Sequence, residues 1–143
     1  MHFDLIDAVT ERSDTRIVAL KQVSIAEEYL RDHFPDFPVL PGVFMIETMV
    51  QAARRLVTHR PEGPGLPRMV MGEVKALRFG SFVKPGESLR VEVEMIGSGP
   101  DSTGTYKFKG SGTVIRPGQP QSSDESAVSG RFTLRPVRVG HGI

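Results

Sequence analysis

Two side chains that can move protons lie near each other in the sequence, His33 and Glu47. Histidine has an unperturbed pKa near neutrality and can act as a base. A glutamate that loses water has a raised pKa, which suits it to donating a proton. We therefore take His33 and Glu47 as the candidate base and acid of one catalytic site.

The stretch between these two residues is the element that must position them. Prolines 35 and 38 predict a stiff, extended loop from His33 to Leu40. A proline suits the start of a helix, and the sequence predicts a helix from Pro41 to His59. Glu47 falls within the apolar face of that helix, so we expect it to be buried. The apolar residues at helical spacing are Val43, Ile46, Val50, Ala53 and Val57.

The predicted start of the helix supplies backbone N–H donors. The N–H groups of Gly42, Val43 and Phe44 have no partner within a helix, and Gly42 has no side chain to block a ligand. Such donors suit an oxyanion or a polarised carbonyl. A base, these donors and a buried acid could together remove a proton next to a carbonyl and expel a β-hydroxyl group.

The run HFPDFPVLPGVFMIE (residues 33–47) resembles the signature of the FabZ-type 3-hydroxyacyl-[acyl-carrier-protein] dehydratases. The run VKALRFGSFVKPGESLRVEVE (residues 74–94) is similar to the strand, turn and strand of the same family. The resemblance implies an α+β hotdog fold over residues 1–143, in which a curled antiparallel sheet wraps one long central helix in a single domain. It also implies a lyase of fatty-acid biosynthesis, which dehydrates a (3R)-3-hydroxyacyl thioester on acyl carrier protein to the trans-2-enoyl thioester.

The resemblance also implies roles for individual residues. His33 would remove the proton from C2, and Glu47 would donate one to the departing C3 hydroxyl, directly or by positioning a water molecule. The N–H of Gly42, with Val43, would hold the thioester oxygen. Neither a cofactor nor a metal is implied. The remaining residues expected at the substrate, most of them apolar, are Phe34, Phe37, Phe44, Met45 and Gln51.

Assembly and partners follow from the same resemblance. Relatives pair the histidine and the acid across a dimer interface, so we expect a homodimer with shared sites. Relatives also form hexamers as trimers of dimers. The expected partner is acyl carrier protein, which is acidic. Residues 51–90 hold eight basic and three acidic residues, either as a solvated face or as a dock for that partner.

Other interpretations of the same residues stay open. The histidine could be a packed or solvated residue, and Glu47 an exposed charge paired with Gln51. A hotdog acyl thioesterase would use Glu47 to activate water. A third possibility is a non-catalytic hotdog protein that binds acyl groups or carrier proteins. Asp32 and Asp36 stand where the family usually has glycine, and the family's usual N-terminal segment has no clear counterpart here. The residues His33, Asp36, Glu47 and His59 match no compact metal motif.

Composition limits the remaining classes. The net charge of +1 argues against a nucleic-acid binder driven by bulk charge, and no apolar run reaches the length of a membrane helix. The sequence has no cysteine, which is compatible with the cytoplasmic location that we expect. Alternation predicts strands at residues 16–23, 69–83 (continuous or broken), 88–96, 105–115 and within 130–139. We expect a short helix at 24–30, a polar turn at 10–15 and a loop at 116–130.

Overall fold

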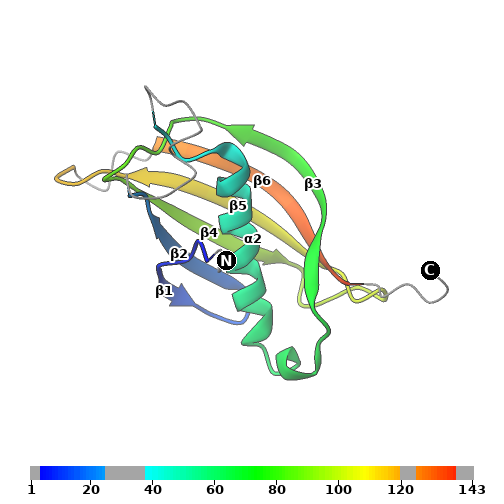
Figure 1. Ribbon diagram of the computed structural model, residues 1–143. Coiled ribbons are helices and arrows are strands. Elements are labelled where there is room, and N and C mark those ends of the chain that lie inside the picture. Colours follow the sequence, from blue (N-terminus) through cyan, green and yellow to red (C-terminus); the bar gives the residue numbers. More distant parts are fainter. Residues whose placement is uncertain (1–3, 25–37, 120–124, 138–143) are drawn as a thin grey trace.

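The computed structural model describes residues 4–24, 38–119 and 125–137 (Figure 1). Helix α2 (Gly42–Thr58) lies across the concave face of one six-stranded antiparallel sheet. The strand order is β1-β2-β4-β5-β6-β3, which leaves β1 and β3 at the two edges. The strands are β1 (Ala8–Arg12), β2 (Arg16–Gln22), β3 (Met69–Phe79), β4 (Ser88–Ile96), β5 (Tyr106–Ile115) and β6 (Glu125–Pro136). A curled sheet around one central helix is the α+β hotdog architecture, so that prediction is confirmed.

The helix packs on the sheet through a face that overlaps the predicted one, since Val50, Ala53 and Val57 are buried as expected. Met45, Met49 and Leu56 are each at most 3% exposed. Their spacing of four and seven residues places them on one side of the helix. Val43 is 66% exposed and Glu47 is half-exposed, so the expectation that both lie on the buried face was wrong. The buried face therefore includes the two methionines and excludes Val43.

Glycines on the inner face of β5 allow the helix to approach the sheet closely. A Cβ atom on Gly110 would lie 2.7 Å from Sδ of Met49, and one on Gly112 would lie 2.8 Å from side-chain atoms of Leu89 and Val128. Contacts this short force neighbouring atoms to move. The missing side chain of Gly110 therefore creates the space that Met49 occupies, and that of Gly112 makes room for Leu89 and Val128 on the neighbouring strands.

The edge strand β3 differs from the rest of the sheet because most of its residues are exposed. Its pairing with β6 shifts register between Met71 and Val74, and again between Lys75 and Arg78. Ala76 lies within the second shift and has a φ of 53°, a left-handed conformation that is unfavourable for a residue with a Cβ. These β-bulges bend the strand as it passes along one side of α2 (Figure 1).

Most predicted elements are present, with shifted ends. The predicted turn at 10–15 is wrong at its start, because residues 10–12 belong to β1, and Glu11 and Arg12 pair with β2. Strand β6 begins at Glu125, inside the predicted loop, and Pro41 is the N-cap with an extended ψ of 145° rather than the first helical residue. A short 3₁₀ turn (η1, Gly63–Gly65) precedes β3. Residues 25–30 of the predicted short helix lie outside the described residues. None of the described helices is long and apolar enough to cross a membrane.

Candidate active site

A largely apolar cavity of about 350 Å³ lies at the N-terminal end of α2. Leu40 approaches it from the preceding loop and donates its N–H to the carbonyl of Val83 at 2.8 Å, which ties the start of the helix to the β3–β4 connection. Phe79 at the end of β3 and Phe82 in that connection are each 54% exposed, which is unusual for large apolar side chains. The cavity is lined by Leu40, Gly42, Val43, Met45, Phe79, Gly80, Ser81, Phe82 and Ala127.

Two backbone donors point out of the helix start at this cavity. The N–H groups of Gly42 and Val43 have no acceptor among the residues that the structure describes. The N–H of Phe44 donates to the carbonyl of Pro41 at 3.0 Å, so the expectation of three free donors was wrong. A tight turn at the N-cap uses the third donor. Two adjacent unpaired N–H groups remain for an oxygen atom of a ligand.

The space beside Gly42 holds an aromatic ring. A Cβ atom on Gly42 would lie 2.8 Å from Cε1 of Phe79. Gly42 therefore allows Phe79 to reach the helix start. The prediction was that Gly42 keeps this space open for a ligand, whereas here the ring of Phe79 occupies it. Because the Phe79 ring is more than half exposed, it can turn aside without disturbing the core.

Glu47 lies one helical turn after Val43 on the face of α2 directed away from the sheet. Its side chain is 34% exposed, and its Oε1 atom lies 3.5 Å from a terminal nitrogen of Arg54. The same Oε1 accepts a hydrogen bond from Nε2 of Gln51 at 3.3 Å. The predicted burial of Glu47 was therefore wrong for the single chain, although the predicted pairing with Gln51 is present.

The structure brings together part of the predicted site. Gly42 and Val43 line the cavity, Glu47 follows on the same side of the helix, and Gln51 contacts Glu47. Phe44 instead packs against the core as a half-buried residue and does not line the cavity. Predicted residues His33, Phe34 and Phe37 lie outside the described residues, as do Asp32 and Asp36.

Phe79 and Phe82 were missed in the sequence analysis, although a signal was present. The segment Phe79-Gly80-Ser81-Phe82 ends a strand with two large aromatic residues around a glycine. Gly80 and Ser81 donate their N–H groups to the carbonyls of Ala127 and Ser126. A Cβ on Gly80 would lie 2.2 Å from the carbonyl oxygen of Ser126, so only glycine permits this close pairing with β6.

The other end of α2 carries a paired polar cluster. Arg60 donates from Nε to Oε2 of Glu62 at 2.9 Å and from a terminal nitrogen to the carbonyl of Ser98 at 3.0 Å. Tyr106, which is fully buried, donates its hydroxyl to the same Glu62 oxygen at 3.1 Å. The hydrogen bond from Arg60 lowers the pKa of Glu62. Burial, and then the bond to Glu62, raises the pKa of Tyr106.

The basic residues of segment 51–90 do not share one surface. Arg54 is paired with Glu47, Arg60 is used in the polar cluster, and Lys75 lies on the outer face of the sheet. The sequence count therefore did not identify a docking face. In the described part of the chain, no group of three or more acidic or histidine side chains is arranged to hold a metal ion.

The fold defines the class to which this chain belongs, that of the hotdog proteins. The dehydratase heterocomplex ApeI:P from Xenorhabdus doucetiae has a similar structure, with a TM-score of 0.62 and 17% sequence identity over 94% of this chain and 99% of that one. A hypothetical thioesterase from Streptococcus pneumoniae TIGR4, solved with coenzyme A, has a TM-score of 0.62 and 14% identity over 91% and 84% of the two chains. At these identities the likeness concerns the fold alone.

Sequence comparison identifies the family within that class. The chain belongs to the FabA-like family, because the model of the FabA-like domain matches residues 1–115. The 3-hydroxyacyl-[acyl-carrier-protein] dehydratase FabZ of Clostridium perfringens strain SM101 is 39% identical over 94 residues, which are 66% of this chain and 67% of that protein. The resemblance noted in the sequence is confirmed.

Proposed function

We propose that this chain is a 3-hydroxyacyl-[acyl-carrier-protein] dehydratase of fatty-acid biosynthesis. The observation that carries the proposal is the match of residues 1–115 to the FabA-like domain. This matched region contains both candidate proton-transfer residues and the helix start. The FabZ dehydratases that resemble the chain at 37–39% identity give the reaction its substrate class.

In the proposed reaction, His33 accepts the proton from C2 of the (3R)-3-hydroxyacyl thioester. The electron pair of that C–H bond forms the C2=C3 double bond, while the thioester oxygen gains charge in the transition state. The N–H groups of Gly42 and Val43 support this step because both residues line the cavity and neither N–H has an acceptor among the described residues. Glu47 supplies a proton to the C3 hydroxyl, directly or through a positioned water molecule, and water leaves.

A second copy of the chain completes the proposed site. Val43, Phe79 and Phe82 are more than half exposed and gather at the cavity beside β3, an edge strand of the described sheet. Exposed apolar side chains next to a free strand edge are typical of a surface that is covered by another chain. A homodimer formed here would remove Glu47 from water and would bring the partner's loop toward it. We propose a shared site in which His33 of one copy works with Glu47 of the other.

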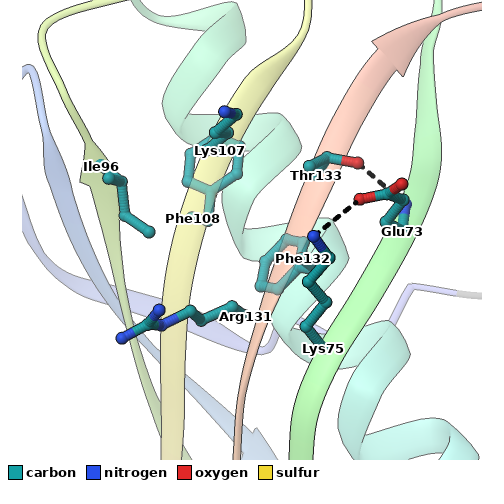
Figure 2. A pocket seen from close by; sticks show the side chains of 8 residues that line it. All are labelled: Glu73, Lys75, Ile96, Lys107, Phe108, Arg131, Phe132 and Thr133. Atoms are coloured by element: carbon teal, nitrogen blue, oxygen red, sulfur yellow. Dashed lines mark hydrogen bonds and ion pairs between the residues drawn. The ribbon is translucent and has the colours of Figure 1, made fainter.

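The outer face of the sheet offers a surface for an acidic carrier protein (Figure 2). Lys107, Arg131 and Lys75 come from the neighbouring strands β5, β6 and β3 and surround a cavity of about 290 Å³, with α2 on the opposite side of the sheet. Lys109 pairs in register with Arg131, which pairs with Lys75, so like charges lie directly opposite each other. A carrier protein rich in carboxylates would relieve this repulsion.

Of these four cations, only Lys75 has an ion pair within the described residues, at 3.5 Å from Glu73. Glu73 also donates its backbone N–H to the hydroxyl of Thr133 (Figure 2). If the carrier protein docks on this face, the double variant Lys107→Glu and Lys109→Glu should raise KM about tenfold for carrier-linked substrate. KM for the same acyl group on pantetheine should not change. Arg12→Glu, on the opposite edge strand, is the matched control.

The function is tested by incubating the protein with 3-hydroxybutyryl and crotonyl thioesters of acyl carrier protein. Enoyl absorbance and free thiol are followed together. A dehydratase interconverts the two thioesters without thiol release, whereas a thioesterase releases thiol. Thiol release, or binding without turnover by wild-type protein, would refute the proposed reaction.

The proposed dimer is tested separately by light scattering, which also distinguishes a dimer from a hexamer. Phe79→Asp should shift the mass toward that of the monomer and remove activity, because it places a charge in the proposed interface. Val137→Asp is a matched control, since Val137 is 37% exposed and lines neither this cavity nor the one on the outer face. A Phe79→Asp protein that keeps the wild-type mass and activity contradicts the shared site.

A further inference from the structure

The two carboxylate oxygens of Glu47 have different surroundings. Nε2 of Gln51 donates to Oε1 at 3.3 Å, and a terminal nitrogen of Arg54 lies 3.5 Å from the same oxygen. Among the residues that the structure describes, no hydrogen bond or ion pair reaches Oε2. One oxygen is therefore held by the chain, and the other is available to a ligand.

Arg54 is itself held at a second point. Its Nε donates to the backbone carbonyl of Met69 at 3.1 Å. Met69 is the first residue of β3 and is 6% exposed, so this acceptor belongs to the rigid sheet. The guanidinium group is planar and presents its donors in a fixed fork. A bond at one side of the fork therefore fixes the direction in which the other side approaches Glu47.

Gln51 is likewise held by backbone. Its Oε1 accepts the N–H of Leu5 at 2.7 Å, and Leu5 is 2% exposed beneath the helix. The carboxylate of Glu47 is thus oriented by two side chains that are anchored to different parts of the fold, the segment before β1 and the start of β3. Neither anchor depends on the side chain of another surface residue.

We propose that Arg54 is a positioning residue that holds Oε1 of Glu47, so that Oε2 is the oxygen presented to the substrate. This inference rests on the proposed dehydratase function. In that reaction the proton on Oε2 passes to the C3 hydroxyl, which leaves as water with the electron pair of the C3–O bond. Freed from Arg54, the carboxylate samples orientations in which neither oxygen faces the hydroxyl group.

A purely structural role for Arg54 gives a different expectation. Its bond to Met69 could serve only to attach the helix to β3, and its loss would then lower stability without changing kcat per folded molecule. Arg54 lines a cavity of about 300 Å³ at this junction, so a small cation can enter beside a truncated residue 54. Arg68 lines the same cavity and forms no ion pair with a described residue, which makes it a matched control.

The test compares Arg54→Ala, Arg54→Lys and Arg68→Ala in the full-length protein. For Arg54→Ala we expect kcat to fall about tenfold with KM nearly unchanged, since a small misplacement of a catalytic group has effects of this size. Millimolar guanidinium should restore part of the lost kcat in this variant only. Arg54→Lys should stay impaired, because a single ammonium group cannot contact Met69 and Glu47 as the fork does. Arg68→Ala should behave as wild type.

Two results would overturn the positioning role. The first is that the wild-type protein is active and Arg54→Ala has the same kcat. The second is a fall in kcat that follows the loss of folded protein and is not restored by guanidinium. If the wild-type protein is inactive, the dehydratase proposal fails, and crystal structures then test the orientation directly. A carboxylate of Glu47 that is unmoved in Arg54→Ala refutes the inference, and one that turns away from Gln51 supports it.

Discussion

The two ends of helix α2 differ in how completely their polar groups are hydrogen-bonded and their apolar side chains are buried. At the C-terminal end, Leu56 and Val57 are at most 2% exposed, and Arg60 and Tyr106 meet on Glu62. At the N-terminal end, Val43 is 66% exposed and two amides have no acceptor in the described part of the chain.

The difference shows which end serves stability and which serves chemistry. A fully hydrogen-bonded polar cluster over packed leucine and valine stabilises the fold at the C-terminal end. An open end with unpaired donors and exposed apolar groups has a cost in isolation, and this cost is recovered when a substrate or a second chain covers it. Substitutions at the two ends should therefore affect different measurements.

The largest effect is expected at the closed end. Leu56→Ala should lower the free energy of unfolding by roughly 2–5 kcal/mol, because a fully buried side chain is lost and a cavity remains. Denaturant unfolding measures the change. The control Val43→Ala should cost less than about 0.5 kcal/mol in the monomer, since Val43 is exposed. Equal losses at the two positions would break the distinction between the ends.

At the open end, Glu47→Gln and His33→Ala should each lower the dehydration rate at least ~10²-fold, the usual scale for removal of an acid or a base. For Glu47→Gln the free energy of unfolding should change little, since a half-exposed ion pair contributes little stability. Steady-state kinetics with carrier-linked substrate and denaturant unfolding provide the two measurements. Near wild-type rates from either variant would refute the roles given.

A smaller effect is expected from Tyr106→Phe, which removes only the hydroxyl that bonds to Glu62. The loss should be about 1 kcal/mol, the net contribution of a typical hydrogen bond. Thermal and denaturant unfolding measure it, with Phe108→Leu as a control for altered aromatic packing in the same strand. A catalytic defect in Tyr106→Phe without a stability loss would mean that the closed end takes part in the reaction.

The smallest effect concerns pH. Because the pKa of Glu62 is lowered in the folded protein, its contribution to stability is present above 4.5, the ordinary value, and is lost as the pH falls through the folded pKa. Glu62→Gln should therefore cost less than about 1 kcal/mol at pH 7, and the difference from wild type should shrink below pH 4.5. Urea unfolding at several pH values tests this. A difference that grows toward acid pH would contradict the sign.

Sequence reasoning predicted the fold well because its signals are local. Alternation located β4 at its observed bounds of Ser88–Ile96, and helical spacing located α2 to within one residue at each end. It failed at β1, where Glu11 and Arg12 are polar yet pair with β2 at an exposed edge. Pairing of a polar edge strand depends on its neighbour rather than on its own side chains.

The site was predicted less completely, because burial and contacts depend on elements distant in sequence. Glu47 was placed within the apolar face because it neighbours Val43, Ile46 and Val50. Val50 is buried, but Val43 is 66% exposed, and Met45 and Met49 are buried in its place. No rule of sequence spacing predicts that Arg54 contacts both Glu47 and the start of β3. The exposure of Phe79 could have been suspected from its place at the end of an edge strand, but its contact with Gly42 could not.

The irregular shape of β3 has a consequence for how the protein behaves at high concentration. A straight, flat, apolar edge is a template for fibrils, since any extended segment can add to it. The two bulges and the left-handed Ala76 prevent a continuous ladder along this edge. Only a strand with matching bends can pair along its length. The distortion of β3 therefore protects the chain from open-ended polymerisation.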